Sequence, residues 1–185
     1  MPRNLRADLV SAAASLLERE GTVGAVSLRG VAREAGVSAP AVYGHFADLD
    51  ALMDAVLDEG FVALLAATRS AAAGVEDPVD RLVAGCQAYV EQGTAAPARY
   101  GAMFAGRHLP HAGEAFDGLV GAVQACVSAG RSASRDPRAD AGLVWTALHG
   151  LVTLRVASPG MGWPDLEAQL TALVERLALL TPEIS

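Results

Sequence analysis

Apolar residues recur every three or four positions along most of the 185-residue chain, the spacing that places them on one face of an α-helix. The strict apolar–polar alternation of a half-buried β-strand does not extend over any length. Glycines and cap–proline pairs such as Asp77-Pro78 and Asp136-Pro137 separate the periodic stretches, as expected at helix ends. The pattern therefore predicts an all-α protein of about nine helices.

The predicted helices form a short N-terminal group and a longer C-terminal group. The first helix covers about residues 5–20, two short helices follow within 27–46, and a long helix has Asp48 as its N-cap. The remaining helices begin near residues 78, 97, 114, 137 and 165, and the last extends to about residue 180. We expect one domain at residues 1–47 and a second helical domain at residues 48–185.

The stretch from Ser27 to Phe46 has the pattern of two short helices joined by a sharp turn. Gly36 supplies the left-handed backbone that ends the first helix, and Ser38 is a suitable N-cap for the second. Pro40 falls in the first turn of that second helix, where a missing N–H costs little. A helix-turn-helix needs such a turn so that its second helix can enter a DNA major groove. The stretch therefore predicts DNA binding.

Several residues here occur together at the fixed offsets of a known family. They are Leu28, Val31, Ala32, Ala35-Gly36-Val37-Ser38, Tyr43, His45-Phe46 and Leu52. The N-terminal third of the chain resembles the DNA-binding domain of the TetR/AcrR family of bacterial transcriptional regulators. The resemblance implies a cytoplasmic homodimer that binds a double-stranded DNA operator, acts most often as a repressor, and is released by a small, hydrophobic effector.

The predicted DNA-binding residues lie on the two short helices. Tyr43 and His45 carry groups that donate to phosphate oxygens, and Arg29 is a candidate for a base or phosphate contact. Tyr43 packing against the first short helix is the alternative. Three neighbouring residues without donors would read bases by apolar contact, for example with thymine methyl groups. The full set is Ser27, Arg29, Ser38, Ala39, Pro40, Ala41, Tyr43 and His45.

Other arginines near this stretch leave alternatives open. Arg3 and Arg6 would enter a minor groove or be solvated. Arg33 would contact DNA or pair with a nearby acid such as Glu34 or Asp8.

The start of the long fourth helix departs from the family pattern. Leu49 stands where the family usually has a lysine, Ala39 stands where a basic residue is common, and Asp48 and Asp50 add negative charge. Losing a phosphate clamp weakens non-specific affinity and flattens its salt dependence. The departure motivates an alternative, a helical ligand-binding or interaction protein with weak or lost DNA binding.

Charge is divided unevenly along the chain, which carries a net −7. Residues 1–47 hold five arginines against four acids, whereas the rest holds nine arginines against seventeen acids. A near-neutral head on an acidic body fits a protein that touches phosphate only through its first domain.

The segment Trp145-Thr-Ala-Leu-His149-Gly150 is similar to the Trp-His-Gly signature of one group of TetR-type C-terminal domains. Trp145 and His149 are four residues apart and share one helix face, so they either line a ligand pocket or pack in the core. The other candidate pocket residues, on helices that surround the family's ligand cavity, are Phe61, Tyr89, Met103 and Phe104.

The last two helices are the predicted dimer interface. Their apolar faces would build a four-helix bundle across a two-fold axis, and a symmetric dimer reads a palindromic operator. The residues assigned to these faces are Leu143, Leu148, Leu151, Val152, Leu166, Leu170, Leu173 and Leu177.

Other chemistry has little support in the sequence. Cys86 and Cys126 match no metal or redox spacing, so we expect buried, reduced thiols. His108 and His111 lack the further ligands that a zinc site needs. No catalytic triad, phosphate loop or dinucleotide fingerprint is readable, which leaves an enzyme built around His149 as a minor alternative and predicts no metal or cofactor. No apolar segment is long enough to span a bilayer, and the first residues do not form a secretory signal.

Overall fold

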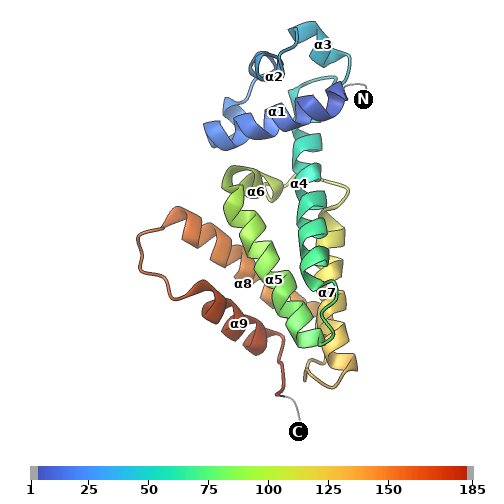
Figure 1. Cartoon of the computed structure of the whole chain (residues 1–185), viewed down its shortest axis with the longest axis vertical. Helices are drawn as coiled ribbons and strands as arrows, with labels where there is room; N and C mark the ends of the chain where they lie inside the picture. Colours follow the sequence, from blue (N-terminus) through green and yellow to red (C-terminus); the bar gives the residue numbers. More distant parts are fainter. Residues whose placement is uncertain (1–3, 183–185) are drawn as a thin grey trace. The chain divides into compact units, whose positions relative to one another are not determined.

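The computed structural model describes residues 4–182, which form nine α-helices and one short 3-10 helix (Figure 1). The β-type pairing in this part of the chain is an isolated bridge between Ser132 and Leu180. The prediction of an all-α fold is therefore confirmed. In order, the helices are α1 (Leu5–Glu20), η1 (Val23–Ala25), α2 (Leu28–Glu34), α3 (Ala39–Tyr43), α4 (Leu49–Ala72), α5 (Pro78–Ala95), α6 (Pro97–Met103), α7 (Ala112–Ser128), α8 (Pro137–Ala157) and α9 (Leu166–Leu177).

The described residues pack into two compact units. The first contains the residues up to Phe61 together with Ala96–Pro110, and the second contains Val62–Ala95 together with the residues from His111 onward. The first unit therefore holds α1 to α3, the first half of α4, and α6. The predicted boundary between residues 47 and 48 divides the chain by expected function, whereas these units divide it by packing. That boundary stays a prediction.

Local signals set the ends of the first helices. The Asn4 side chain accepts a hydrogen bond from the Ala7 N–H (3.3 Å) at the start of α1, and Gly21 ends the helix with a φ of +80°. The Ser27 hydroxyl oxygen accepts from the Gly30 N–H (3.2 Å) and starts α2. The predicted bounds of α1 are thus confirmed.

A core of apolar and aromatic side chains joins α4 to α6 within the first unit. Phe61 is almost fully buried, and its ring meets the Phe104 ring edge-on at 5.4 Å between centroids. Tyr100 meets Phe104 in the same way at 5.0 Å. Gly60 allows α6 to approach because a Cβ at this position would lie 2.8 Å from the Met103 sulfur. A side chain at position 60 would therefore require the Met103 side chain to shift.

Aspartate caps start three helices of the second unit, α5, α8 and α9. Asp77 accepts hydrogen bonds from the Val79 and Asp80 N–H groups (2.7 and 3.1 Å). Asp136 and Asp165 each accept one bond from the residue three positions on (3.1 and 2.9 Å). The two predicted cap–proline starts are confirmed.

The last helix is shorter than predicted. It begins at Leu166, because Asp165 is its cap, and it ends at Leu177 rather than near residue 180. Leu179 has a φ of +50°, and its carbonyl oxygen accepts a hydrogen bond from the Ala133 N–H (2.9 Å). The chain leaves the helix because pairing with the loop before α8 replaces the helical hydrogen bonds.

Both cysteines are buried and unpaired, as predicted. Burial raises the pKa of the Cys86 thiol to about 12, so the unreactive thiol form prevails at neutral pH. None of the described helices is both long and apolar enough to cross a membrane.

Candidate nucleic-acid interface

The turn between α2 and α3 has the geometry that a helix-turn-helix requires. Gly36 adopts a φ of +68°, and the next N–H, of Val37, bonds back to the Ala32 carbonyl oxygen (2.9 Å). Val42 and Phe46 are buried and anchor α3 and the segment after it to the head. The opposite side of α3 is therefore presented outward on a fixed support.

Most of the predicted DNA-binding residues are exposed to solvent. Tyr43 exposes 60% of its surface, so the alternative in which it packs against α2 is wrong. Six of the eight are exposed, namely Ser27, Arg29, Ser38, Pro40, Tyr43 and His45, and two are half-buried, namely Ala39 and Ala41. Ser38 stands at the N-cap position of α3, but its hydroxyl makes no capping hydrogen bond within the described structure. Hydroxyl, guanidinium and imidazole groups are thus presented together with small apolar ones.

The remaining arginines of the head have distinct surroundings. Arg19 forms an ion pair with the Glu34 carboxylate (3.0 Å between Nη2 and Oε2), and this pairing lowers the pKa of Glu34. Arg33 is exposed, and its positive charge also contributes to lowering the pKa of Glu34. The Arg6 guanidinium lies over the Phe46 ring, 5.0 Å from its centroid, rather than being simply solvated. Arg3 lies outside the described residues.

The acidic start of α4 has a basic partner that sequence reasoning missed. Asp48 caps the helix as predicted, accepting a hydrogen bond from the Ala51 N–H (2.8 Å). Arg107, which follows α6, donates to Asp50 (2.9 Å) and also to Asp54. The pair is 57 residues apart in sequence, so no local spacing signals it. The carboxylates of Asp54 and Asp50 raise the pKa of the Arg107 guanidinium, which is charged at any physiological pH.

The six predicted ligand-pocket residues fall into two groups. Phe61, Met103 and Phe104 belong to the aromatic core of the first unit, where Tyr100 joins them. The second group, Tyr89, Trp145 and His149, belongs to the second unit.

The second group forms a connected cluster. The Trp145 indole N–H donates to the Tyr89 hydroxyl oxygen (3.1 Å), and the Trp145 and His149 rings lie 6.4 Å apart between centroids. Phe116, which the sequence did not single out, adds a third ring 5.9 Å from Trp145. Burial lowers the pKa of His149, so its imidazole is neutral at pH 7. The cluster is mainly aromatic, with one neutral hydrogen-bonding ring.

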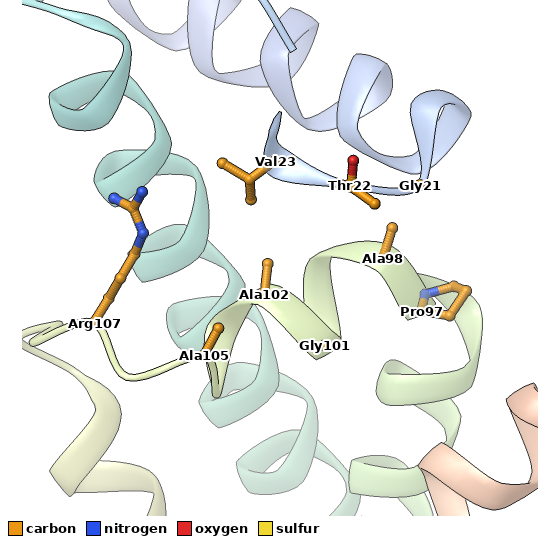
Figure 2. A pocket seen from close by; sticks show the side chains of 9 residues that line it. All are labelled: Gly21, Thr22, Val23, Pro97, Ala98, Gly101, Ala102, Ala105 and Arg107. Atoms are coloured by element: carbon orange, nitrogen blue, oxygen red, sulfur yellow. The ribbon is translucent and has the colours of Figure 1, made fainter. Parts of the chain in front are cut away.

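A hollow of about 480 Å³ opens on the first unit, between the end of α1 and α6 (Figure 2). Small side chains and backbone line most of it, and the Arg107 side chain stands at one end. The lining residues are Gly21, Thr22, Val23, Pro97, Ala98, Gly101, Ala102, Ala105 and Arg107. None of the six predicted pocket residues is among them.

The residues named for the dimer interface are partly wrong. Leu148, Leu151, Val152 and Leu170 are buried inside the protomer and cannot meet a partner. The exposed apolar residues of α8 lie on the opposite side of the helix and include Leu143 and Leu154, exposed by 54% and 53%. No group of three or more histidine, cysteine or acidic side chains placed to hold a metal ion occurs among the described residues.

Two family profiles match the chain. The profile described as bacterial regulatory proteins, tetR family, matches residues 9–56, and the profile described as tetracyclin repressor-like, C-terminal domain, matches residues 82–178. The second match alone spans more than half of the chain.

Solved structures agree with these matches. A protein of unknown function from Rhodococcus sp. RHA1 is 31% identical, with a TM-score of 0.84 over 95% of this chain and 94% of that chain. A bacterial regulatory protein in the tetR family from Rhodococcus RHA1 is 22% identical (TM-score 0.74; 97% and 100% covered). The fatty acid degradation regulator FadR from Bacillus halodurans is 16% identical (TM-score 0.75; 97% and 96% covered), and these last two likenesses show the fold alone. The chain belongs to the TetR family of bacterial transcriptional regulators, with that family's helix-turn-helix DNA-binding domain followed by a tetracyclin repressor-like C-terminal domain.

Proposed function

We propose that this protein is a cytoplasmic repressor that binds a palindromic operator as a homodimer and leaves it when a small hydrophobic molecule binds the C-terminal domain. The observation that carries the proposal is the exposed surface of α2 and α3, where Arg29, Tyr43 and His45 lie on elements anchored by buried apolar residues. Exposed side chains on elements that buried residues hold in place are suited to contacting a ligand.

The chemistry of this surface fits duplex DNA. The Tyr43 hydroxyl, the His45 imidazole and the Ser38 hydroxyl have the donors that phosphate oxygens accept, and Arg29 adds a positive charge. Ala39, Pro40 and Ala41 present apolar surface suited to thymine methyl groups in the major groove. We assign phosphate positioning to the first group and base reading to the second.

The aromatic cluster of the second unit supports an effector of low polarity. Phe116, Trp145 and Tyr89 offer ring surfaces, and neutral His149 is able to accept or donate one hydrogen bond. Trp145, His149 and Gly150 would then have the role of the Trp-His-Gly signature. We place the effector against this cluster and assign Phe61, Met103 and Phe104 to coupling within the first unit.

Dimerisation through α8 and α9 places two recognition helices on one duplex. The exposed Leu143 and Leu154 give α8 an apolar face outside the protomer's own core, which is suited to a symmetric contact. A two-fold axis then requires an operator with two half-sites in inverted orientation.

The experiment is to select duplexes from random-sequence DNA with the purified protein and to measure binding of the selected duplex by fluorescence anisotropy. We expect tight, salt-sensitive binding of two protomers per palindrome. Arg29→Ala should weaken this binding at least tenfold, which corresponds to a loss of about 1.4 kcal/mol of binding free energy. Failure of the selection to enrich any sequence would contradict the proposal.

A second function is favoured by Leu49 and by the acids that follow it. A helical ligand-binding protein with little DNA affinity would bind selected and scrambled duplexes equally weakly. A thermal-shift screen of small apolar compounds, followed by anisotropy with each hit, separates the two: a repressor releases its duplex, whereas the alternative shows stabilisation without any DNA complex to release.

A further inference from the structure

Arg107 links the segment after α6 to the first two turns of α4. Its guanidinium donates to Asp50 Oδ1 at 2.9 Å and to Asp54, and these two acids are one helical turn apart on the same face of α4. The Arg107 side chain is only 27% exposed, whereas that of Asp50 is 82% exposed. Arg107 is therefore a partly buried cation that pairs with two largely exposed carboxylates.

The charge around these acids makes the pair significant. Residues 1–47 hold five arginines against four acids, and Arg19 is already paired with Glu34. Asp48, Asp50 and Asp54 then follow directly after the helix-turn-helix, and position 49 is a leucine. Without the charge of Arg107, Asp50 and Asp54 would add two negative charges here next to that of Asp48.

Uncompensated carboxylates near a DNA-binding surface repel phosphate over about the Debye length, ~8 Å at physiological ionic strength. Arginine at position 107 reduces the net charge of the Asp50–Asp54 site from −2 to −1. Because the group comes from a segment far along the chain, its contribution is not visible in the helix-turn-helix itself.

We propose that Arg107 is an affinity-determining residue for DNA binding: from outside the helix-turn-helix, it neutralises part of the acidic start of α4, where position 49 carries no positive charge. The inference rests on the proposed function, since it concerns the strength of the same DNA complex. It acts through charge, so it is distinct from a purely structural link between the loop and α4.

The test is a series of variants that changes the site's charge in steps, measured by anisotropy on the duplex selected with the wild-type protein. Arg107→Gln gives −2, wild type −1, the triple variant Arg107→Gln/Asp50→Asn/Asp54→Asn gives 0, and Asp50→Asn/Asp54→Asn gives +1. We expect affinity to rise in that order, by about two- to fivefold per step at low salt, with the steps shrinking as salt is added.

A matched control is Arg69→Gln, which removes one positive charge and an exposed ion pair with Glu114 (3.8 Å) in the second unit. It is expected to change neither DNA affinity nor melting temperature. Melting temperatures of the whole series show that each variant is folded.

The outcomes separate the two proposals. If both Arg107→Gln and Asp50→Asn/Asp54→Asn weaken binding and the triple variant does not recover it, the pair is a structural link and the inference is overturned. If Arg107→Gln leaves affinity unchanged while Arg29→Ala abolishes binding, the inference alone fails. If wild-type protein enriches no duplex, the proposed function fails and takes this inference with it.

Discussion

The helix-turn-helix (α2 and α3) and the second unit are both helical, but their candidate binding side chains differ in exposure. On α2 and α3, Arg29, Tyr43 and His45 are exposed, and Tyr43 keeps 60% of its surface in solvent. In the second unit, Trp145 and Tyr89 bond to each other, and burial keeps His149 neutral at pH 7. One region exposes its polar groups to solvent, and the other engages them in internal contacts.

This difference predicts whether a mutation should change mainly DNA binding or mainly stability. Side chains outside the core contribute little to folding, so their loss should reduce binding and leave stability unchanged. Side chains in a bonded aromatic cluster contribute packing and hydrogen bonding, so their loss should reduce stability first.

The largest effect is expected from Trp145→Ala. Removing a half-buried indole that contacts Phe116 and bonds to Tyr89 should lower the free energy of unfolding by about 3 kcal/mol. The measurement is chemical denaturation followed by circular dichroism. Trp145→Phe is the matched control, since it keeps a ring and deletes the hydrogen bond, at a cost of about 1 kcal/mol. Equal stability of both variants and wild type would mean that the cluster contributes nothing to packing.

Tyr43→Ala should do the reverse. We expect at least a tenfold loss of affinity for the selected duplex, about 1.4 kcal/mol, with an unfolding free energy within about 0.5 kcal/mol of wild type. Tyr43→Phe isolates the hydroxyl and should lose a smaller part of the affinity. A large drop in stability for Tyr43→Ala would break the contrast between the two regions.

The apolar residues of α3 allow a sharper test on the DNA side. Replacing single thymines of the selected duplex by deoxyuridine removes one methyl group and changes no hydrogen bond. At positions read by Ala39, Pro40 or Ala41, each replacement should weaken binding about fourfold, as loss of ~0.8 kcal/mol of apolar contact predicts. Uniform insensitivity across every thymine would show that these three residues do not read bases.

The smallest expected effect is a pH dependence from His149. Its pKa is lower in the folded protein than in the unfolded chain because burial disfavours the imidazolium. The unfolded chain therefore binds the proton more readily, and this contribution to stability is complete above the unfolded pKa and is lost as pH falls through it toward the folded pKa. Denaturation at pH 7.5 and at lower pH should show a smaller decrease for His149→Gln than for wild type. An identical decrease in both proteins would locate the pH dependence elsewhere.

Much of the fold follows from local chemistry that the sequence displays. Gly21, Gly36 and the aspartate caps at Asp77 and Asp136 set helix ends through bonds to near neighbours, so spacing alone places them. The helix-turn-helix was predictable for the same reason.

Contacts between distant segments were not predictable in this way. The Arg107 pair joins residues more than fifty positions apart, and Phe116 meets Trp145 across two helices. Helix α8 has apolar residues on more than one side, with Leu148 buried and Leu143 exposed, so helical periodicity does not say which side a partner would cover. The division of the pocket candidates between two units has the same origin, since tertiary packing decides it.

The most direct measurement is photocrosslinking of wild-type protein to the selected duplex with 5-iodouracil in place of single thymines, followed by mass spectrometry of the crosslinked peptides. We expect crosslinks within residues 27–45, with Tyr43 and His45 as the favoured aromatic acceptors, and none at the Trp145 cluster. Crosslinks that map to the second unit, with the helix-turn-helix unmodified, would contradict the assignment of DNA binding to α2 and α3.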